Sequence, residues 1–123
     1  MGVRDFRELK VWQKAHALAL AVYGVTASFP PHERYGLTSQ LRRSCASIGA
    51  NIAEGCGRGT NPDLARFLQI AMGSASETES HLLLARDLGL LGQAGWERLS
   101  ADLVEVKRML ASLIVRVRAV GRQ

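Results

Sequence analysis

Eight apolar side chains alternate at spacings of three and four residues near the end of the chain, and this stripe constrains the fold most. Residues three and four apart share one face of an α-helix, so the stripe predicts a helix over about residues 94–120. A helix with one apolar face needs neighbours that cover it. The residues of the stripe are Trp96, Leu99, Leu103, Val106, Leu110, Leu113, Val117 and Val120.

Three earlier segments have the same periodicity and predict helices over about residues 8–29, 37–57 and 62–88. Four long helices with short connections favour an all-α, antiparallel up-down-up-down four-helix bundle. No linker or repeat divides the chain, so we expect residues 1–123 to form a single domain. The stripes are Val11, Ala15, Leu18, Val22, Val25 and Phe29; Leu37, Leu41, Cys45, Ile48 and Ile52; and Leu64, Leu68, Ala71, Ala75, Thr78, Leu82 and Ala85.

The ends of the first two helices carry recognisable signals. Asp5 and Glu8 have capping-box spacing at the first helix, although the helix could also begin one turn later. The proline pair at 30–31 ends it, because proline donates no backbone hydrogen bond. Thr38 or a neighbouring residue is expected to cap the second helix.

The third helix is bounded by stronger signals. Glycines at 55, 57 and 59 predict that the second helix ends there in a turn. Thr60 then has capping-box spacing with Asp63, and the Asn-Pro pair at 61–62 offers an alternative start. The Leu-Gly-Leu sequence at 88–90 predicts a glycine C-cap.

Two segments depart from a plain bundle. Residues 46–53 and 71–76 are mostly small, and Gly49 and Gly73 within them predict a close crossing of the second and third helices. Residues 17–23 are apolar around the whole helix, and a helix of this kind needs cover on all sides. Self-association would supply that cover; alternatively, the alanines simply lie on a surface.

The charge of the chain is basic and uneven. There are thirteen arginines against three lysines, and the formal net charge is +5. From Val106 to the end, five basic residues occur without an acid. This balance suits a polyanion such as RNA or DNA, although a solvated basic surface also explains it.

Cys45 and Cys56 lie eleven residues apart, about 16 Å along a continuous helix at 1.5 Å per residue. That separation excludes a disulfide between them, and both thiols are interpreted as buried fillers. No signal peptide or apolar run of membrane-spanning length is visible. We therefore expect a cytoplasmic protein without a membrane partner.

No catalytic or metal-binding pattern is visible. His16, His32 and His81 share no ligand spacing, and Glu77 with His81 is interpreted as a local helix pair. The glycine run lacks the Lys-Ser/Thr of a phosphate-binding loop. We expect no cofactor, no metal and no enzymatic activity.

The sequences LKVWQ at 9–13, YGLTSQLRR at 35–43 and NIAEG at 51–55 resemble the bacterial proteins encoded in intervening sequences of 23S ribosomal RNA genes. GRG at 57–59, RFL at 66–68, GS at 73–74 with Glu77 and Glu79, and LGL at 88–90 extend the resemblance over nearly the whole chain. That family is similar in turn to the accessory variability protein of diversity-generating retroelements.

The resemblance implies a helical bundle that assembles as a homopentamer around a central channel. In the retroelement relatives, a basic surface binds RNA or DNA and a partner reverse transcriptase. Two positions depart from the family pattern: Gly49 replaces a usual proline and Cys56 a usual aromatic residue. The loss of the proline would straighten the second helix. The loss of the aromatic residue removes any contact that its ring would make.

Five basic residues are the candidate nucleic-acid contacts. Arg42 and Arg43 diverge by about 100° on a helix, so at least one should reach a partner subunit, an acid or a phosphate. Lys107, Arg118 and Arg122 lie near one another on the face of the last helix. By contrast, Glu54 and Arg58 lie four residues apart, which is the spacing of a salt bridge along a helix.

The leading hypothesis is a non-enzymatic, oligomeric bundle that binds RNA or another nucleic acid electrostatically. The alternative is a protein-interaction scaffold that recruits a partner such as a reverse transcriptase, with nucleic-acid binding incidental.

Overall fold

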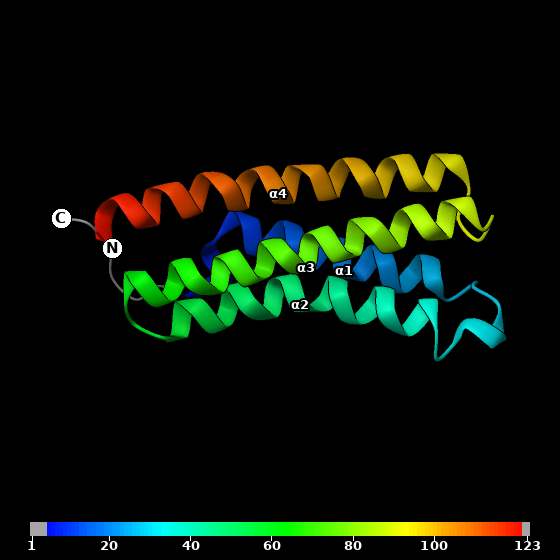
Figure 1. The fold of residues 1–123 in the computed structure, drawn as a ribbon, viewed down its shortest axis with the longest axis horizontal. Coiled ribbons are helices and arrows are strands. Elements are labelled where there is room, and N and C mark those ends of the chain that lie inside the picture. The colour runs from blue at the N-terminus through cyan, green and yellow to red at the C-terminus, as the bar shows by residue number, and fades with distance from the viewer. Residues whose placement is uncertain (1–4, 122–123) are drawn as a thin grey trace.

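The computed structural model describes residues 5–121, which form four α-helices and two short 3₁₀ helices, without a strand in that range. The four long helices lie side by side as a bundle (Figure 1). The all-α prediction is therefore confirmed. In chain order the elements are η1 (Phe6–Glu8), α1 (Lys10–Thr26), η2 (Pro31–Glu33), α2 (Leu37–Gly57), α3 (Asn61–Asp87) and α4 (Gln93–Gly121).

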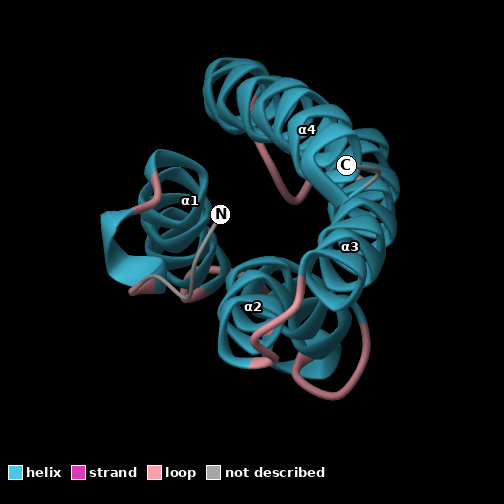
Figure 2. Ribbon diagram, turned by 90° about the vertical axis from the view of Figure 1, so that its left-hand side faces the viewer, coloured by secondary structure: helices cyan, strands magenta, loops and turns pink. Residues whose placement is uncertain are grey.

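The helices follow an arc in chain order, from α1 through α2 and α3 to α4, in the end view of Figure 2. The α2–α3 and α3–α4 contacts are extensive, whereas the α1–α4 contact is the smallest between long helices that touch. The helices also differ in length, with 17 residues in α1 and 29 in α4. At a rise of 1.5 Å per residue, α4 is about 18 Å longer than α1. The C-terminal end of α4 therefore extends past the beginning of α1 (Figure 1).

The apolar stripes form the core. Every residue of the second and third stripes is buried, and Leu99, Leu103, Val106 and Leu110 of the last stripe are at most 1% exposed. Trp96 of that stripe is half-buried, and Val120 is exposed, with 40% of its surface accessible. Val120 lies on the part of α4 that α1 does not reach, which explains why this stripe residue is not covered.

The first helix is shorter than the predicted range 8–29. Asp5 caps η1 instead of α1, since its carboxylate accepts a hydrogen bond of 2.9 Å from the Arg7 backbone N–H. The helix begins one turn later, at Lys10, as the alternative start predicted. At the other end α1 stops at Thr26, and Phe29 closes a turn before Pro30.

Of the residues predicted to cap α2, Thr38 does not, and the N-cap position belongs to the neighbouring Gly36, without a side-chain hydrogen bond. Thr38 lies inside α2 and is buried, while the carboxylate of Glu33 accepts a hydrogen bond of 3.1 Å from the Leu37 backbone N–H. Thr60 does cap α3, because its hydroxyl accepts a hydrogen bond from the Asp63 N–H at 3.3 Å. Glu33 of η2 thus accepts a hydrogen bond from the first turn of α2, which the sequence analysis had expected of a residue in or beside α2.

The glycine C-cap of α3 is confirmed. Gly89 has a φ of +75°, in the left-handed region that favours glycine. The Leu90 N–H donates to the Ala85 carbonyl at 2.9 Å, and the Gly89 N–H donates to the Arg86 carbonyl at 3.0 Å. These two bonds form a Schellman motif, which ends the helix and satisfies its last carbonyls.

Gly49 and Gly73 are not themselves the points of close α2–α3 contact that the sequence predicted. A Cβ on Gly49 would lie 3.3 Å from the indole nitrogen of Trp12 on α1, and a Cβ on Gly73 would have nothing within 4 Å. The small residues of α2 and α3 do meet, with Ser47 donating to the Ser74 hydroxyl at 2.6 Å. The glycine that does permit a tight α2–α3 approach is Gly55, where a Cβ would lie 2.9 Å from the Phe67 Cβ.

Both cysteines are buried on the uninterrupted helix α2, which is the condition under which their spacing excludes a disulfide. Burial raises the pKa of the Cys45 thiol to about 12. Across residues 5–121, no helix is both long and apolar enough to span a bilayer.

Candidate nucleic-acid interface

Arg42 joins α2 to the end of α1. Its Nε donates a hydrogen bond of 2.8 Å to the Thr26 hydroxyl, and its Nη2 donates to the Tyr23 carbonyl at 3.3 Å. The guanidinium also lies 4.6 Å from the centre of the Tyr23 ring. A cation at the C-terminal end of a helix is favourable because carbonyl dipoles point at it. Arg42 is therefore committed to contacts within the chain.

Arg43 reaches an acid, one of the three outcomes predicted for the arginine pair. It donates a hydrogen bond to the Glu77 carboxylate on α3 and another of 3.0 Å to Gln40. His81 lies 3.2 Å from the same carboxylate, as predicted for a local helix pair. The hydrogen bonds from His81 and Arg43 lower the pKa of Glu77. Arg43 thus contributes to an α2–α3 contact.

The three candidates near the end of the chain do not form one free cluster. Lys107 donates a hydrogen bond of 2.9 Å to the Glu79 carboxylate on α3 and is half-buried. Arg118 donates to the Gln69 amide oxygen at 3.3 Å. The two residues share a helix face but lie eleven residues apart, about 16 Å along the axis. Arg122 lies outside the described residues.

Most other cations also have partners. Arg58 pairs with Glu54 at 3.3 Å, as its spacing predicted, and Lys14 pairs with Glu105 at the same distance. Within residues 5–121, a small group of cationic side chains has no ion pair, side-chain hydrogen bond or aromatic contact with another described residue. That group consists of Lys10, Arg98, Arg108 and Arg116.

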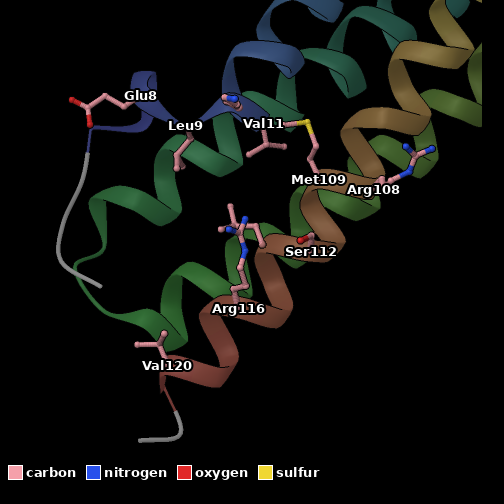
Figure 3. A pocket seen from close by; sticks show the side chains of 10 residues that line it. Glu8, Leu9, Val11, Arg108, Met109, Ser112, Arg116 and Val120 are labelled. Carbon is pink, nitrogen blue, oxygen red and sulfur yellow. The ribbon is translucent and has the colours of Figure 1, made fainter.

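Three members of that group, Lys10, Arg108 and Arg116, line a single open cleft of about 580 Å³. It lies between the beginning of α1 and the C-terminal half of α4 (Figure 3). We refer to it as the α1–α4 cleft. Arg116 extends from α4 toward the segment of Leu9 and Val11, whereas the Glu8 carboxylate points outward. Cations from two helices therefore meet at one opening.

The inner wall of the α1–α4 cleft is apolar. Leu9, Val11 and Leu113 each have less than a tenth of their surface exposed, while Met109 is half-buried and Val120 more open. The cleft exists because α1 begins late and is short, so that the last turns of α4 extend beyond it. The geometry thus combines an apolar wall with a cationic rim.

The sequence did not single out Lys10, Arg108 or Arg116. It did show that the chain after Val106 has five basic residues without an acid. What it could not show is that Lys107 finds its acid on α3, 28 residues earlier, whereas Arg108 and Arg116 find none in the described range. The choice among these cations depends on helix packing.

Within the described range, no three histidine, cysteine or acidic side chains come close enough together to hold a metal ion. The hydrogen-bonding pair of Glu77 and His81 is a contact between two side chains of one helix.

The model of the 23S rRNA-intervening sequence protein family matches residues 7–112. The chain belongs to this family. The match begins in η1 and ends within α4, so it includes Lys10 and Arg108 but stops before Arg116. The α1–α4 cleft of this intervening-sequence family member therefore uses one cation beyond the matched region.

A solved structure is similar to this family member in fold and sequence. It is the crystal structure of a protein with unknown function from the S23 ribosomal protein family of Bacteroides thetaiotaomicron VPI-5482. The TM-score is 0.76 with 28% sequence identity, over 85% of this chain and 97% of that chain. No curated protein sequence matches the chain.

Proposed function

We propose that this intervening-sequence protein is a non-enzymatic, cytoplasmic bundle that binds RNA through the α1–α4 cleft. The observation that carries the proposal is the convergence of Lys10, Arg108 and Arg116, which have no partner among residues 5–121, on one opening. The family description names an intervening sequence of 23S ribosomal RNA, and for this reason we choose RNA as the polyanion to test first.

The physical argument rests on the difference between paired and unpaired cations. A cation already paired with an acid, such as Lys107 with Glu79, must give up that contact before it binds phosphate. An unpaired arginine makes no such exchange, and its planar fork suits two phosphate oxygens at once. Arg108 and Arg116 are therefore better placed for phosphate contacts than Arg42, Arg43 or Lys107.

The proposal includes self-association of the up-down-up-down bundle, as a homopentamer. Leu20 is 64% exposed and Tyr23 47% exposed on the segment that is apolar all round. Beside them, Trp12 and alanines of α1 and α2 line a groove of about 390 Å³. Light scattering tests this part: we expect a mass near five chains, and a smaller mass after Leu20→Glu. A monomer at micromolar concentration would overturn it.

The alternative is a scaffold that recruits a partner protein such as a reverse transcriptase, with RNA binding incidental. The apolar wall of the cleft favours this alternative, since protein partners cover apolar surface on binding. A pull-down from native cells separates the two. A protein partner retained after Lys10→Gln, Arg108→Gln and Arg116→Gln are combined would favour the scaffold.

Filter binding with structured RNA at low salt tests the proposal itself. We expect the triple variant to bind roughly tenfold or more weakly than the unaltered protein, because it loses three phosphate contacts. Arg98→Gln is the matched control, since Arg98 is also exposed and unpaired within the described range but does not line the cleft. Equal affinity in the triple variant, or no affinity in the unaltered protein, would reject the proposal.

A further inference from the structure

We infer that the α1–α4 cleft takes unpaired nucleotides of single-stranded RNA and not an RNA double helix. The inference rests on the proposed function and specifies the class of RNA. It follows from the size of the cleft, from its apolar wall and from the position of its cations.

The size of the cleft separates the two forms of RNA. Its volume of about 580 Å³ lies within the range of roughly 300–1,000 Å³ that holds small organic ligands. An unpaired base with its sugar fits a space of that size. A double helix stacks its bases inside and is far wider than the cleft, so it could touch only the rim.

The wall of the cleft matches the face of a base. Met109 and Val120 are the more open apolar side chains on α4 and lie toward opposite ends of the cleft, with Val11 of α1 beside Met109 (Figure 3). An unstacked base has an apolar face that gains by leaving water against such a wall. A double helix would leave this wall without a complementary surface, because its base faces are already stacked.

The cations lie where the phosphates of that strand would run. Lys10 is at the first turn of α1, whereas Arg108 and Arg116 lie eight residues apart on α4, about 12 Å along its axis. Arg116 extends over the opening (Figure 3), where its guanidinium can also stack on a base. The arrangement offers backbone contacts on both sides of a base seated on the wall.

An apolar segment of a second copy is a poorer occupant. It would cover the wall but would also remove three cations from water, and the acid on the lining, Glu8, points outward. Burying cations without acids is costly. A polyanion with apolar faces satisfies both parts of the cleft.

The test compares three fluorescent RNAs of equal length at one low salt concentration: a single strand without pairing, a hairpin with a large loop, and a blunt duplex. The full chain is used. We expect the single strand and the hairpin to bind at least roughly tenfold more tightly than the duplex, because only their unpaired bases can bury an apolar face against the aliphatic wall.

A variant of the wall adds a second readout. Val120→Asn changes an exposed residue and leaves the charge unaltered, so folding should be preserved. We expect it to weaken binding of the single strand several-fold and to leave the weak duplex binding unchanged. Ala101→Asn, at another exposed position of α4 away from the cleft, is the matched control and should change neither.

The outcomes are distinguishable. A duplex that binds as tightly as the single strand would overturn the inference and leave the proposed RNA function intact. No binding of any of the three RNAs would overturn both. A change in molecular mass on light scattering after Arg116→Gln would mark the cleft as a contact between copies, and it would also overturn the inference.

Discussion

The Nε of Arg42 lies 2.8 Å from the hydroxyl of Thr26, and this hydrogen bond joins α2 to the last turn of α1. The Thr26 hydroxyl also donates to the Val22 carbonyl at 2.7 Å, so it serves as an acceptor and a donor at once. The contact matters because α1 otherwise packs lightly on α4. It assigns Arg42 to stability, although the sequence indicated a nucleic-acid contact.

We therefore predict that Arg42→Ala destabilises the fold without weakening RNA binding. The change removes two hydrogen bonds and deprives the buried Thr26 hydroxyl of its donor, which should lower the free energy of unfolding by about 1–3 kcal/mol. Urea unfolding and filter binding check the two parts. A variant of normal stability with much weaker RNA binding would restore Arg42 to the interface.

Two glycines offer a matched pair for the α2–α3 packing. A Cβ at Gly55 would approach the Phe67 Cβ to 2.9 Å, so Gly55→Ala forces the backbones apart and should cost about 1–3 kcal/mol. A Cβ at Gly73 would meet nothing within 4 Å, so Gly73→Ala should stabilise the helix by up to about 1 kcal/mol. Thermal unfolding measures both. Loss of stability in the second variant would show that something packs on Gly73.

The Glu77 contact predicts a dependence of stability on pH. The pKa of Glu77 in the folded protein lies below its ordinary value of 4.5, mainly because of the hydrogen bond to His81. The stabilisation is therefore fully present above pH 4.5 and is lost as the pH falls through the lower folded-state value. As the pH is lowered below 4.5, we expect the free energy of unfolding to fall less steeply in Glu77→Gln than in the unaltered protein. Identical slopes in both proteins would contradict this account.

Cys45 should be chemically inert in the folded protein. Burial raises its pKa to about 12, so almost no thiolate is present at pH 8, and reagents cannot reach the sulfur. We expect iodoacetamide to alkylate Cys45 only after unfolding in urea, as mapped by mass spectrometry of its peptide. Equal rates in folded and unfolded protein would show that α2 opens readily.

Much of the fold could be predicted from the sequence because helix periodicity is a local property. The stripe of α4 and the glycine cap at Gly89 depend on residues within a few positions of one another. The predictions that failed depend on contacts between distant segments. Gly49 faces Trp12 of α1, and Glu33 of η2 caps α2 in place of Thr38.

The candidate site was less predictable for the same reason. The sequence identified the basic end of the chain, but whether a cation is available depends on the acids that packing brings beside it. Arg43 and Lys107 meet Glu77 and Glu79 of α3, and both become structural contacts. The cleft itself arises from the difference in length between α1 and α4, which no single position in the sequence encodes.

The salt dependence of RNA affinity tests the central claim most directly. The dissociation constant for a single-stranded RNA is measured at several salt concentrations for the unaltered protein, for Arg108→Gln with Arg116→Gln, and for Arg98→Gln. Each phosphate contact contributes about 0.7 to the slope of log affinity against log salt for single strands. We predict that the magnitude of this negative slope is smaller by about 1.4 in the double variant and unchanged in Arg98→Gln. An unaltered slope in the double variant would contradict the assignment of the α1–α4 cleft as the RNA site.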